Sequence, residues 1–198
     1  MNVTLTVPAI LLAAGASSRL GQPKQLVTVG DEVLLERALR IAREAGADPI
    51  LVILGANAQP IRARIDFQSA IPVLNREWQQ GISTSIRTGL RELDIRAPES
   101  PCVLLITCDQ PRLTAAHLRS LIAAFLAQPA PAIAASYYAG SRGTPAVFPR
   151  SLFPQLLALQ GDKGARGLID AAFCPVVSLP FAGGEIDIDE PADLDRLR

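Results

Sequence analysis

The amino-acid sequence predicts an α/β fold in which one doubly wound, mostly parallel sheet is covered by helices on both faces. Strand-like and helix-like segments alternate almost from end to end, which is typical of βαβ units. The strand-like segments are nearly all apolar, as expected of parallel strands buried on both faces. With 198 residues, of which 49% are hydrophobic, the chain suits one α/β domain, so residues 1–198 are predicted to form a single domain.

The elements follow from the local pattern of apolar residues. Thr4–Leu12 is β-rich and apolar, and Val33–Ala45 carries apolar residues at three- and four-residue spacing up to Gly46. The other predicted strands are Pro49–Leu54, Ile71–Leu74, Cys102–Thr107 and Pro131–Ser136. The other predicted helices are Ala58–Asp66, a segment beginning at Ile82, Thr114–Ala127, Leu152–Leu159 and Ala165–Ala172. Glu185–Leu197 is expected to run from strand to helix, and Gly140–Pro149 is interrupted by glycine and proline.

The composition excludes several classes of protein. There are 19 basic and 19 acidic residues without a basic cluster, so nucleic acid is not an expected partner. Three cysteines without C-x-x-C spacing suggest neither a disulfide framework nor a zinc site. The apolar run from Pro8 to Ala14 is well short of the ~20 residues that a membrane span needs. We expect a cytoplasmic protein that acts on a small soluble substrate.

The loop that leaves the first strand predicts a phosphate site. Its small residues allow backbone N–H groups to approach phosphate oxygens, and Arg19 and Lys24 add positive charge. The P-loop is excluded because it needs adjacent Gly and Lys, whereas Lys24 stands three residues after Gly21. The Rossmann fingerprint is excluded because it needs three closely spaced glycines, and this loop has only two, Gly15 and Gly21. The alternative is a solvated turn whose cations face water.

Acidic residues stand at two places where a cation could meet a phosphate. Asp109 directly follows a buried strand, and Asp187 and Asp189 share one face of a segment predicted to be extended. Magnesium prefers one or two carboxylates together with substrate oxygens and water. Helix capping or a turn is the alternative role for each of these residues.

A third segment, residues 80–90, begins a predicted helix with consecutive hydroxyl residues. Taken alone, the hydroxyls of Ser83, Thr84 and Ser85 could cap this helix and do nothing more. His117 lies inside a predicted helix and is given no role.

These segments together resemble the nucleotidylyltransferase superfamily that includes the molybdenum-cofactor nucleotidylyltransferases. The resemblance rests on Leu12-Ala13-Ala14-Gly15-x-Ser17-x-Arg19-x-Gly21-x-x-Lys24, on Asp109-x-Pro111 and on Asp189-x-Pro191-x-Asp193-Leu194. Residues 19–26, Gly143-Thr144-Pro145 and the segment from Gly161 to Arg166 look most like the molybdenum cofactor cytidylyltransferases. The related guanylyltransferases typically carry Gly-Gly where this chain has Ala13-Ala14.

The resemblance implies a Rossmann-like nucleotidyltransferase fold and transfer of CMP from CTP to the terminal phosphate of molybdopterin, with release of pyrophosphate. It implies catalytic roles for Arg19, Lys24 and Asp109, and Mg²⁺ on Asp109 and Asp189, with Asp187 as the alternate ligand. The implied nucleotide contacts are Ala13, Ala14, Gly15, Ser17, Arg19, Lys24, Gly81, Ser83 and Ser85.

The loops of the second half are the implied place of the acceptor, and a molybdoenzyme or insertion chaperone is a possible partner. Three alternatives stay open: guanylyl transfer to the same cofactor, transfer to a sugar or alditol phosphate, and a non-catalytic module that delivers a nucleotide cofactor.

Overall fold

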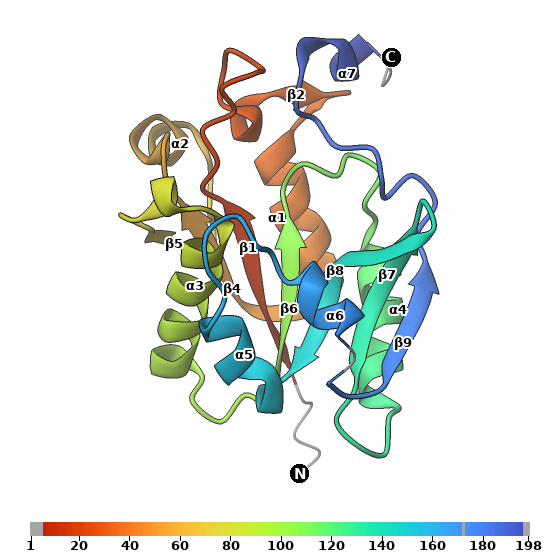
Figure 1. Cartoon of the computed structure of the whole chain (residues 1–198). Helices are drawn as coiled ribbons and strands as arrows, with labels where there is room; N and C mark the ends of the chain where they lie inside the picture. The colour runs from red at the N-terminus through yellow and green to blue at the C-terminus, as the bar shows by residue number, and fades with distance from the viewer. Residues whose placement is uncertain (1–5, 172, 196–198) are drawn as a thin grey trace.

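The computed structural model describes residues 6–171 and 173–195, which form a three-layer arrangement of a central sheet between helices (Figure 1). The sheet has seven strands in the order β5-β4-β1-β6-β8-β7-β9. These strands are β1 (Val7–Ala13), β4 (Ala47–Leu54), β5 (Ile71–Leu74), β6 (Cys102–Thr107), β7 (Ile133–Tyr138), β8 (Ser141–Pro149) and β9 (Val176–Pro180). The helices are α1 (Leu34–Glu44), α2 (Ala58–Arg64), α3 (Ile82–Arg96), α4 (Ala115–Leu126), α5 (Phe153–Leu157), α6 (Arg166–Asp170) and α7 (Pro191–Asp195).

The predicted fold class is confirmed. Strand β1 pairs in parallel with β4 and β6, β4 pairs in parallel with β5, and β7 pairs in parallel with β9. Alternate residues of β1 supply the two cores: Leu11 packs on the side of α1 and α4, and Ile10 packs on the side of α3 and α5. The apolar strands are therefore buried on both faces, as their composition predicts.

Helix α3 approaches β1 closely because its middle carries a glycine. A Cβ atom added at Gly89 would lie 2.7 Å from Cγ2 of Ile10, well inside contact distance. The short distance between α3 and β1 holds the first turn of α3 beside the carboxyl end of β1.

Two strands of the second half differ from the prediction. The segment Gly140–Pro149 contains the nine-residue strand β8, which runs antiparallel to both β6 and β7. Strand β9, which was not predicted, lies at the edge of the sheet beside β7. Pro145 and Pro149 obscure β8 in the sequence because prolines usually argue against a strand inside a sheet. A two-stranded hairpin, β2 (Thr28–Val29) with β3 (Glu32–Val33), was also not predicted.

The prediction of a strand at the start of Glu185–Leu197 is wrong. Residues 185–190 have no ladder partner in the described part of the chain, where the backbone bond from Ile188 N–H to the Asp109 carbonyl, at 3.0 Å, joins them to the end of β6. The helix that follows is confirmed as α7, although Leu197 lies outside the described residues, as do Thr4 and Ala172.

His117 has a structural role in the described chain. Its ring stacks on Phe181 at 4.5 Å between centroids, and Nε2 lies 2.8 Å from Oγ of Ser136. The Ser136 hydroxyl donates to the Pro145 carbonyl, so His117 Nε2 is the donor to Ser136. Burial lowers the pKa of His117, which favours the neutral ring. No helix among the described residues has the length and apolar character to cross a membrane.

Candidate active site

A cleft of about 380 Å³ opens at the carboxyl ends of β1 and β6. This is where open α/β sheets bind ligands, because strand order changes and loops diverge there. The loop after β1 (red in Figure 1) and the C-terminal segment (blue) come together on this side of the sheet. The cleft is lined by Leu12, Ala13, Ala14, Gly15, Ala16, Lys24, Gln25, Trp78, Gln79, Gly81, Ile82, Ser85, Thr107, Cys108, Asp109 and Asp162.

The loop after β1 turns its carbonyl groups toward the protein. The carbonyls of residues 13–17 accept, in order, from Gln25 Nε2 (2.8 Å), Ala56 N–H (3.2 Å), Gln25 Nε2 (3.1 Å), Asn57 Nδ2 (3.5 Å) and Leu20 N–H (3.1 Å). By contrast, the N–H groups of residues 15–18 have no acceptor within the ranges 6–171 and 173–195. A run of free N–H dipoles with the carbonyls turned away is the electrostatic requirement of a phosphate site.

Ser17 shapes this loop. Its backbone adopts the left-handed conformation at φ 54°, and its Oγ accepts from the N–H of Lys24 at 3.0 Å. This bond folds residues 18–24 back on the loop, which brings Lys24 over the strand ends. Ser17 therefore contributes through backbone geometry, and a direct contact of its hydroxyl with a nucleotide stays a prediction.

Lys24 lies between the two carboxylates that the sequence predicts as metal ligands. Its Nζ donates to Oδ2 of Asp109 at 2.7 Å and to Oδ1 of Asp189 at 2.9 Å, and its side chain is only 14% exposed. Burial by itself lowers the pKa of Lys24, but the charge and hydrogen bond of Asp109 outweigh it, so this pKa is raised and the ammonium stays charged. The structure thus brings Asp109 and Asp189 together across 80 residues of sequence.

Asp189 also pairs with Arg19, at 2.8 Å, while the neighbouring Glu190 accepts from the same guanidinium at 3.3 Å. Burial would raise the pKa of Asp189, but the hydrogen bonds and charges of Lys24 and Arg19 lower it. The Arg19 side chain is 64% exposed and lines an adjoining acidic hollow beside the cleft. Its predicted contact with a triphosphate stays a prediction.

Asp187, the alternate metal ligand, lies in the same acidic hollow as Arg19. Loss of water around the carboxyl, followed by repulsion from Asp109, raises the pKa of Asp187 to about 7, although the residue as a whole is exposed. The choice between Asp187 and Asp189 as a ligand stays open, and Asp189 is the one that shares Lys24 with Asp109.

The start of α3 forms the opposite wall of the cleft. Ser85 lines the cleft and accepts from Nδ2 of Asn75 at 3.0 Å, and the same amide donates to Oγ1 of Thr84 at 2.8 Å. Ser83 is fully buried, its N–H donates to the Gly161 carbonyl at 3.1 Å, and its Oγ has no partner among the described residues. Ser85 is therefore better placed than Ser83 for the predicted nucleotide contact.

Gly81 allows the loop at 161–162 to close over this wall. Its φ of +100° favours glycine, and an added Cβ would lie 2.3 Å from the backbone carbon of Gly161. We expect Gly81→Ala to reduce kcat/KM for the nucleotide by at least about tenfold, because both backbones must move (~1.4 kcal/mol). Gly167→Ala, where an added Cβ meets nothing within 4 Å, is the matched control. Equal kinetics for the two variants would contradict this role for Gly81.

Several cleft residues carried no signal in the sequence. Trp78 and Gln79 belong to a short 3₁₀ turn before α3, and Asp162 arrives from the loop after α5. Their polar or aromatic character alone does not separate them from surface residues. Cys108 also lines the cleft, and burial raises its pKa to about 12, so the thiol is protonated at neutral pH.

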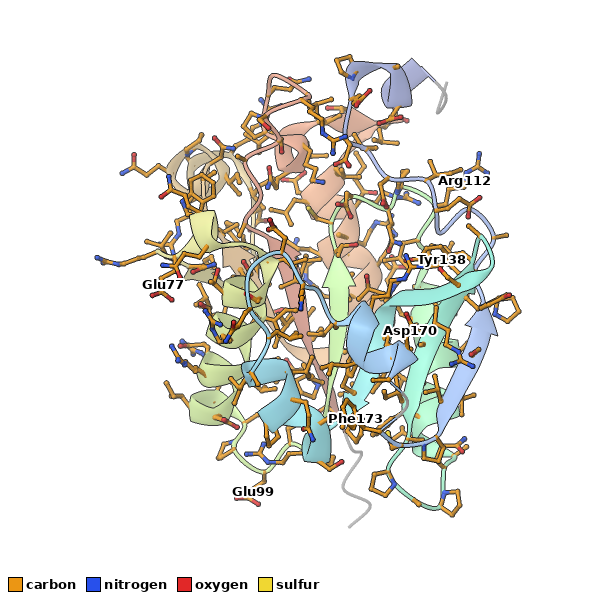
Figure 2. The ribbon with its side chains drawn as sticks, viewed as in Figure 1. Glu77, Glu99, Arg112, Tyr138, Asp170 and Phe173 are labelled. Atoms are coloured by element: carbon orange, nitrogen blue, oxygen red, sulfur yellow. The ribbon has the colours of Figure 1, made fainter. Side chains whose placement is uncertain are left out.

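A smaller hollow of about 120 Å³ adjoins the cleft and shares Leu12, Ile82 and Thr107 with it. Its other side brings together the two stretches that the resemblance assigns to the acceptor, with Gly143 and Thr144 on β8 facing residues 164–166. Tyr138 (Figure 2) closes it, and its hydroxyl donates to the Thr144 carbonyl at 3.1 Å.

The donor set of the cleft suits a hard divalent cation. Asp109 and Asp189 supply carboxylate oxygens that already converge on one positive group, Lys24 Nζ. Within the described ranges, no group of three or more His, Cys, Asp or Glu side chains is placed to hold a metal. An ion here would therefore need further ligands from a substrate and water, as Mg²⁺ usually does.

Comparison with known proteins identifies the family of the chain. Residues 9–176 match the family described as MobA-like NTP transferase domain. The nicotine blue oxidoreductase of Paenarthrobacter nicotinovorans is 32% identical over 81% of this chain and 79% of that protein. A probable molybdenum cofactor guanylyltransferase of Nostoc sp. is 31% identical over 94% of this chain and 87% of its own length.

Among solved structures, Rv0371c from Mycobacterium tuberculosis superposes with a TM-score of 0.85 at 34% identity, over 98% of each chain. A crystal structure of the same protein in complex with manganese gives a TM-score of 0.81 at 31% identity, over 97% of each chain. This chain belongs to the family of MobA-like NTP transferase domains.

Proposed function

We propose that this protein transfers CMP from CTP to the terminal phosphate of a molybdopterin-type cofactor and releases pyrophosphate. The observation that carries the proposal is the loop at residues 15–18, whose N–H groups have no acceptor among the described residues, set beside Lys24 and its two carboxylates, Asp109 and Asp189. Such a loop suits the phosphates of a nucleotide, and Lys24 with its two carboxylates supports a reacting phosphorus beside them.

The reaction needs positioning and charge neutralisation more than acid–base catalysis. An oxygen of the acceptor phosphate forms a bond to the α-phosphorus, and the bond from that phosphorus to the bridging oxygen breaks, so its electron pair leaves with pyrophosphate. The acceptor phosphate is largely dianionic at neutral pH because its second pKa is near 6. It therefore attacks without a protein base, and the protonated thiol of Cys108 has no part in the step.

The residues of the cleft have different roles in the proposed reaction. The N–H groups of residues 15–18 hold the β- and γ-phosphates, and Arg19 neutralises the leaving pyrophosphate from the rim. Lys24 turns from its carboxylates toward the α-phosphate as charge builds up there. Mg²⁺ held by Asp109 and Asp189 supplies Lewis-acid charge to the phosphate oxygens when bound. The manganese complex of the related mycobacterial protein supports a divalent cation in this fold.

The acceptor occupies the smaller hollow between β8 and residues 164–166. That hollow shares three lining residues with the cleft, so an acceptor phosphate there reaches the α-phosphorus across the end of β1. The related guanylyltransferase supports a molybdenum cofactor as the acceptor. A molybdoenzyme or an insertion chaperone is the expected recipient of the product. The name of the oxidoreductase relative points to another reaction, so the acceptor has to be tested directly.

We propose that Ala14 determines the choice between a cytosine and a guanine base. The side chain of Ala13 packs in the core on the α1 side, whereas that of Ala14 lies near Gly55 and Trp78 at the cleft wall. A methyl group at Ala14 leaves room for a pyrimidine and crowds the second ring of a purine. We expect wild-type kcat/KM with the pterin acceptor to favour CTP over GTP by at least about tenfold.

Two glycine variants test this choice with one measurement, the ratio of kcat/KM for CTP to that for GTP. Ala14→Gly is expected to lower the ratio severalfold, and Ala13→Gly is expected to leave it unchanged because that methyl lies in the core. A wild-type preference for GTP would contradict cytidylyl transfer and favour the guanylyl alternative. Turnover only with a sugar or alditol phosphate would contradict the pterin acceptor.

A further inference from the structure

Two glutamines occupy corresponding places in the site, each directly after one of its charged residues. Gln25 follows Lys24 and is fully buried, and Gln110 follows Asp109 and is 5% exposed. The Nε2 of each side chain donates to two backbone carbonyls, and the Oε1 of each has no donor among the described residues. Among the described residues, each of these glutamine side chains therefore bonds to the backbone through its amide donors alone.

Gln25 holds the phosphate loop from behind. Its amide donates to the carbonyls of Ala13 at 2.8 Å and of Gly15 at 3.1 Å. These two carbonyls flank the peptide at which β1 gives way to the loop. Both carbonyls are thus held toward the protein, while the N–H groups of residues 15–18 have no acceptor among the described residues.

Gln110 holds backbone carbonyls in the same way near the carboxylates Asp109 and Asp189. Its amide donates to the Thr144 carbonyl at 3.2 Å and to the Gly184 carbonyl at 2.8 Å. Gly184 begins the segment that carries Asp189, and this segment is tied again to β6 by the bond from Ile188 N–H to the Asp109 carbonyl. Gln110 therefore fixes the distance between β8 and the segment that presents the second carboxylate.

We propose that Gln25 and Gln110 are a pair of positioning residues with separable tasks, Gln25 for the phosphate loop and Gln110 for the carboxylate pair. The inference rests on the proposed function, because it assigns phosphate binding and cation binding to two halves of one site. We assign neither glutamine a contact with the reacting atoms. Each acts through the backbone that it holds.

Methionine variants separate the two tasks, because methionine keeps the length of glutamine and removes both amide donors. Binding of pyrophosphate is measured by calorimetry without metal. Binding of Mn²⁺ is measured by electron paramagnetic resonance with saturating α,β-methylene CTP, which is not cleaved. Gln155→Met is the matched control, because Gln155 also has a buried Oε1 without a partner but lies in α5.

We expect Gln25→Met to weaken pyrophosphate binding about tenfold and to leave Mn²⁺ binding unchanged. Gln110→Met is expected to do the reverse, and Gln155→Met is expected to change neither. Circular dichroism checks that the variants fold, and Gln25→Glu and Gln110→Glu, which also lack the donors, replace a methionine variant that does not fold.

Equal losses of both affinities in the two variants, or unchanged affinities, would overturn the separable roles while leaving the proposed function standing. A wild-type protein that binds neither pyrophosphate nor Mn²⁺ would contradict the proposed function and this inference with it.

Discussion

Asp109→Asn is expected to lower kcat by at least about 100-fold, or ~2.7 kcal/mol, while the fold stays intact. The carboxylate stands at the carboxyl end of β6, is 20% exposed, and supports no core packing. Its structural contribution comes from the backbone carbonyl that accepts from Ile188 N–H, and this group is retained in the variant. Loss of the charge removes the attraction that holds Lys24 in the cleft and one of the two oxygen ligands proposed for the cation.

The measurement is steady-state turnover of CTP with the pterin acceptor, together with thermal unfolding followed by circular dichroism. Asp94→Asn is the matched control, because Asp94 is also ion-paired, with Arg150 at 2.8 Å, and belongs to α3 away from the cleft. Activity of Asp109→Asn within about tenfold of the wild type would remove this carboxylate from the catalytic role.

Lys24→Met is expected to lower kcat by about 100-fold and to raise KM for CTP much less. Its charge is worth most as the α-phosphate becomes crowded in the transition state, and less in the ground state, where Asp109 and Asp189 already neutralise it. Methionine retains most of the apolar stem, so the effect reports the ammonium group. The variant also leaves two carboxylates facing each other, which we expect to lower its unfolding temperature in metal-free buffer.

Arg19→Ala provides the comparison for Lys24→Met. Arg19 is largely exposed at the rim, so its removal is expected to raise KM at least as much as it lowers kcat. If both variants changed only KM, Lys24 would contribute to ground-state binding alone, and its role at the α-phosphate would be contradicted.

The sequence predicted the parts of the fold that depend on local pattern. Seven predicted elements between Val7 and Thr107 lie within a few residues of their expected positions, because apolar runs and helical spacing are strong signals there. Strand β8 was missed because its two prolines resemble loop signals, although its register with β6 and β7 is set by tertiary packing. The segment at residues 185–190 alternates like a strand, but no neighbouring strand pairs with it.

In the candidate site, too, the residues marked by local pattern were predicted, and the contacts that depend on tertiary packing were not. The sequence predicted Lys24, Asp109 and Asp189 as site residues because each stands at a strand end or in a motif, and the structure brings their side chains together. It did not show that Lys24 lies between the two carboxylates, since this depends on contacts across 85 and 165 residues. Gln25 and Gln110 were missed as well. A buried amide that holds backbone carbonyls leaves no pattern in the sequence.

The most direct test of nucleotidyl transfer follows labelled phosphorus from CTP to the acceptor. The protein is incubated with Mg²⁺, the pterin cofactor and CTP labelled either at the α- or at the γ-phosphate, and the pterin product is separated from pyrophosphate. Nucleotidyl transfer places α-label in the pterin product and, among the products, γ-label only in pyrophosphate, and Asp109→Asn is expected to lose both signals. Transfer of γ-label to the pterin, or α-label that never leaves CTP, would contradict it.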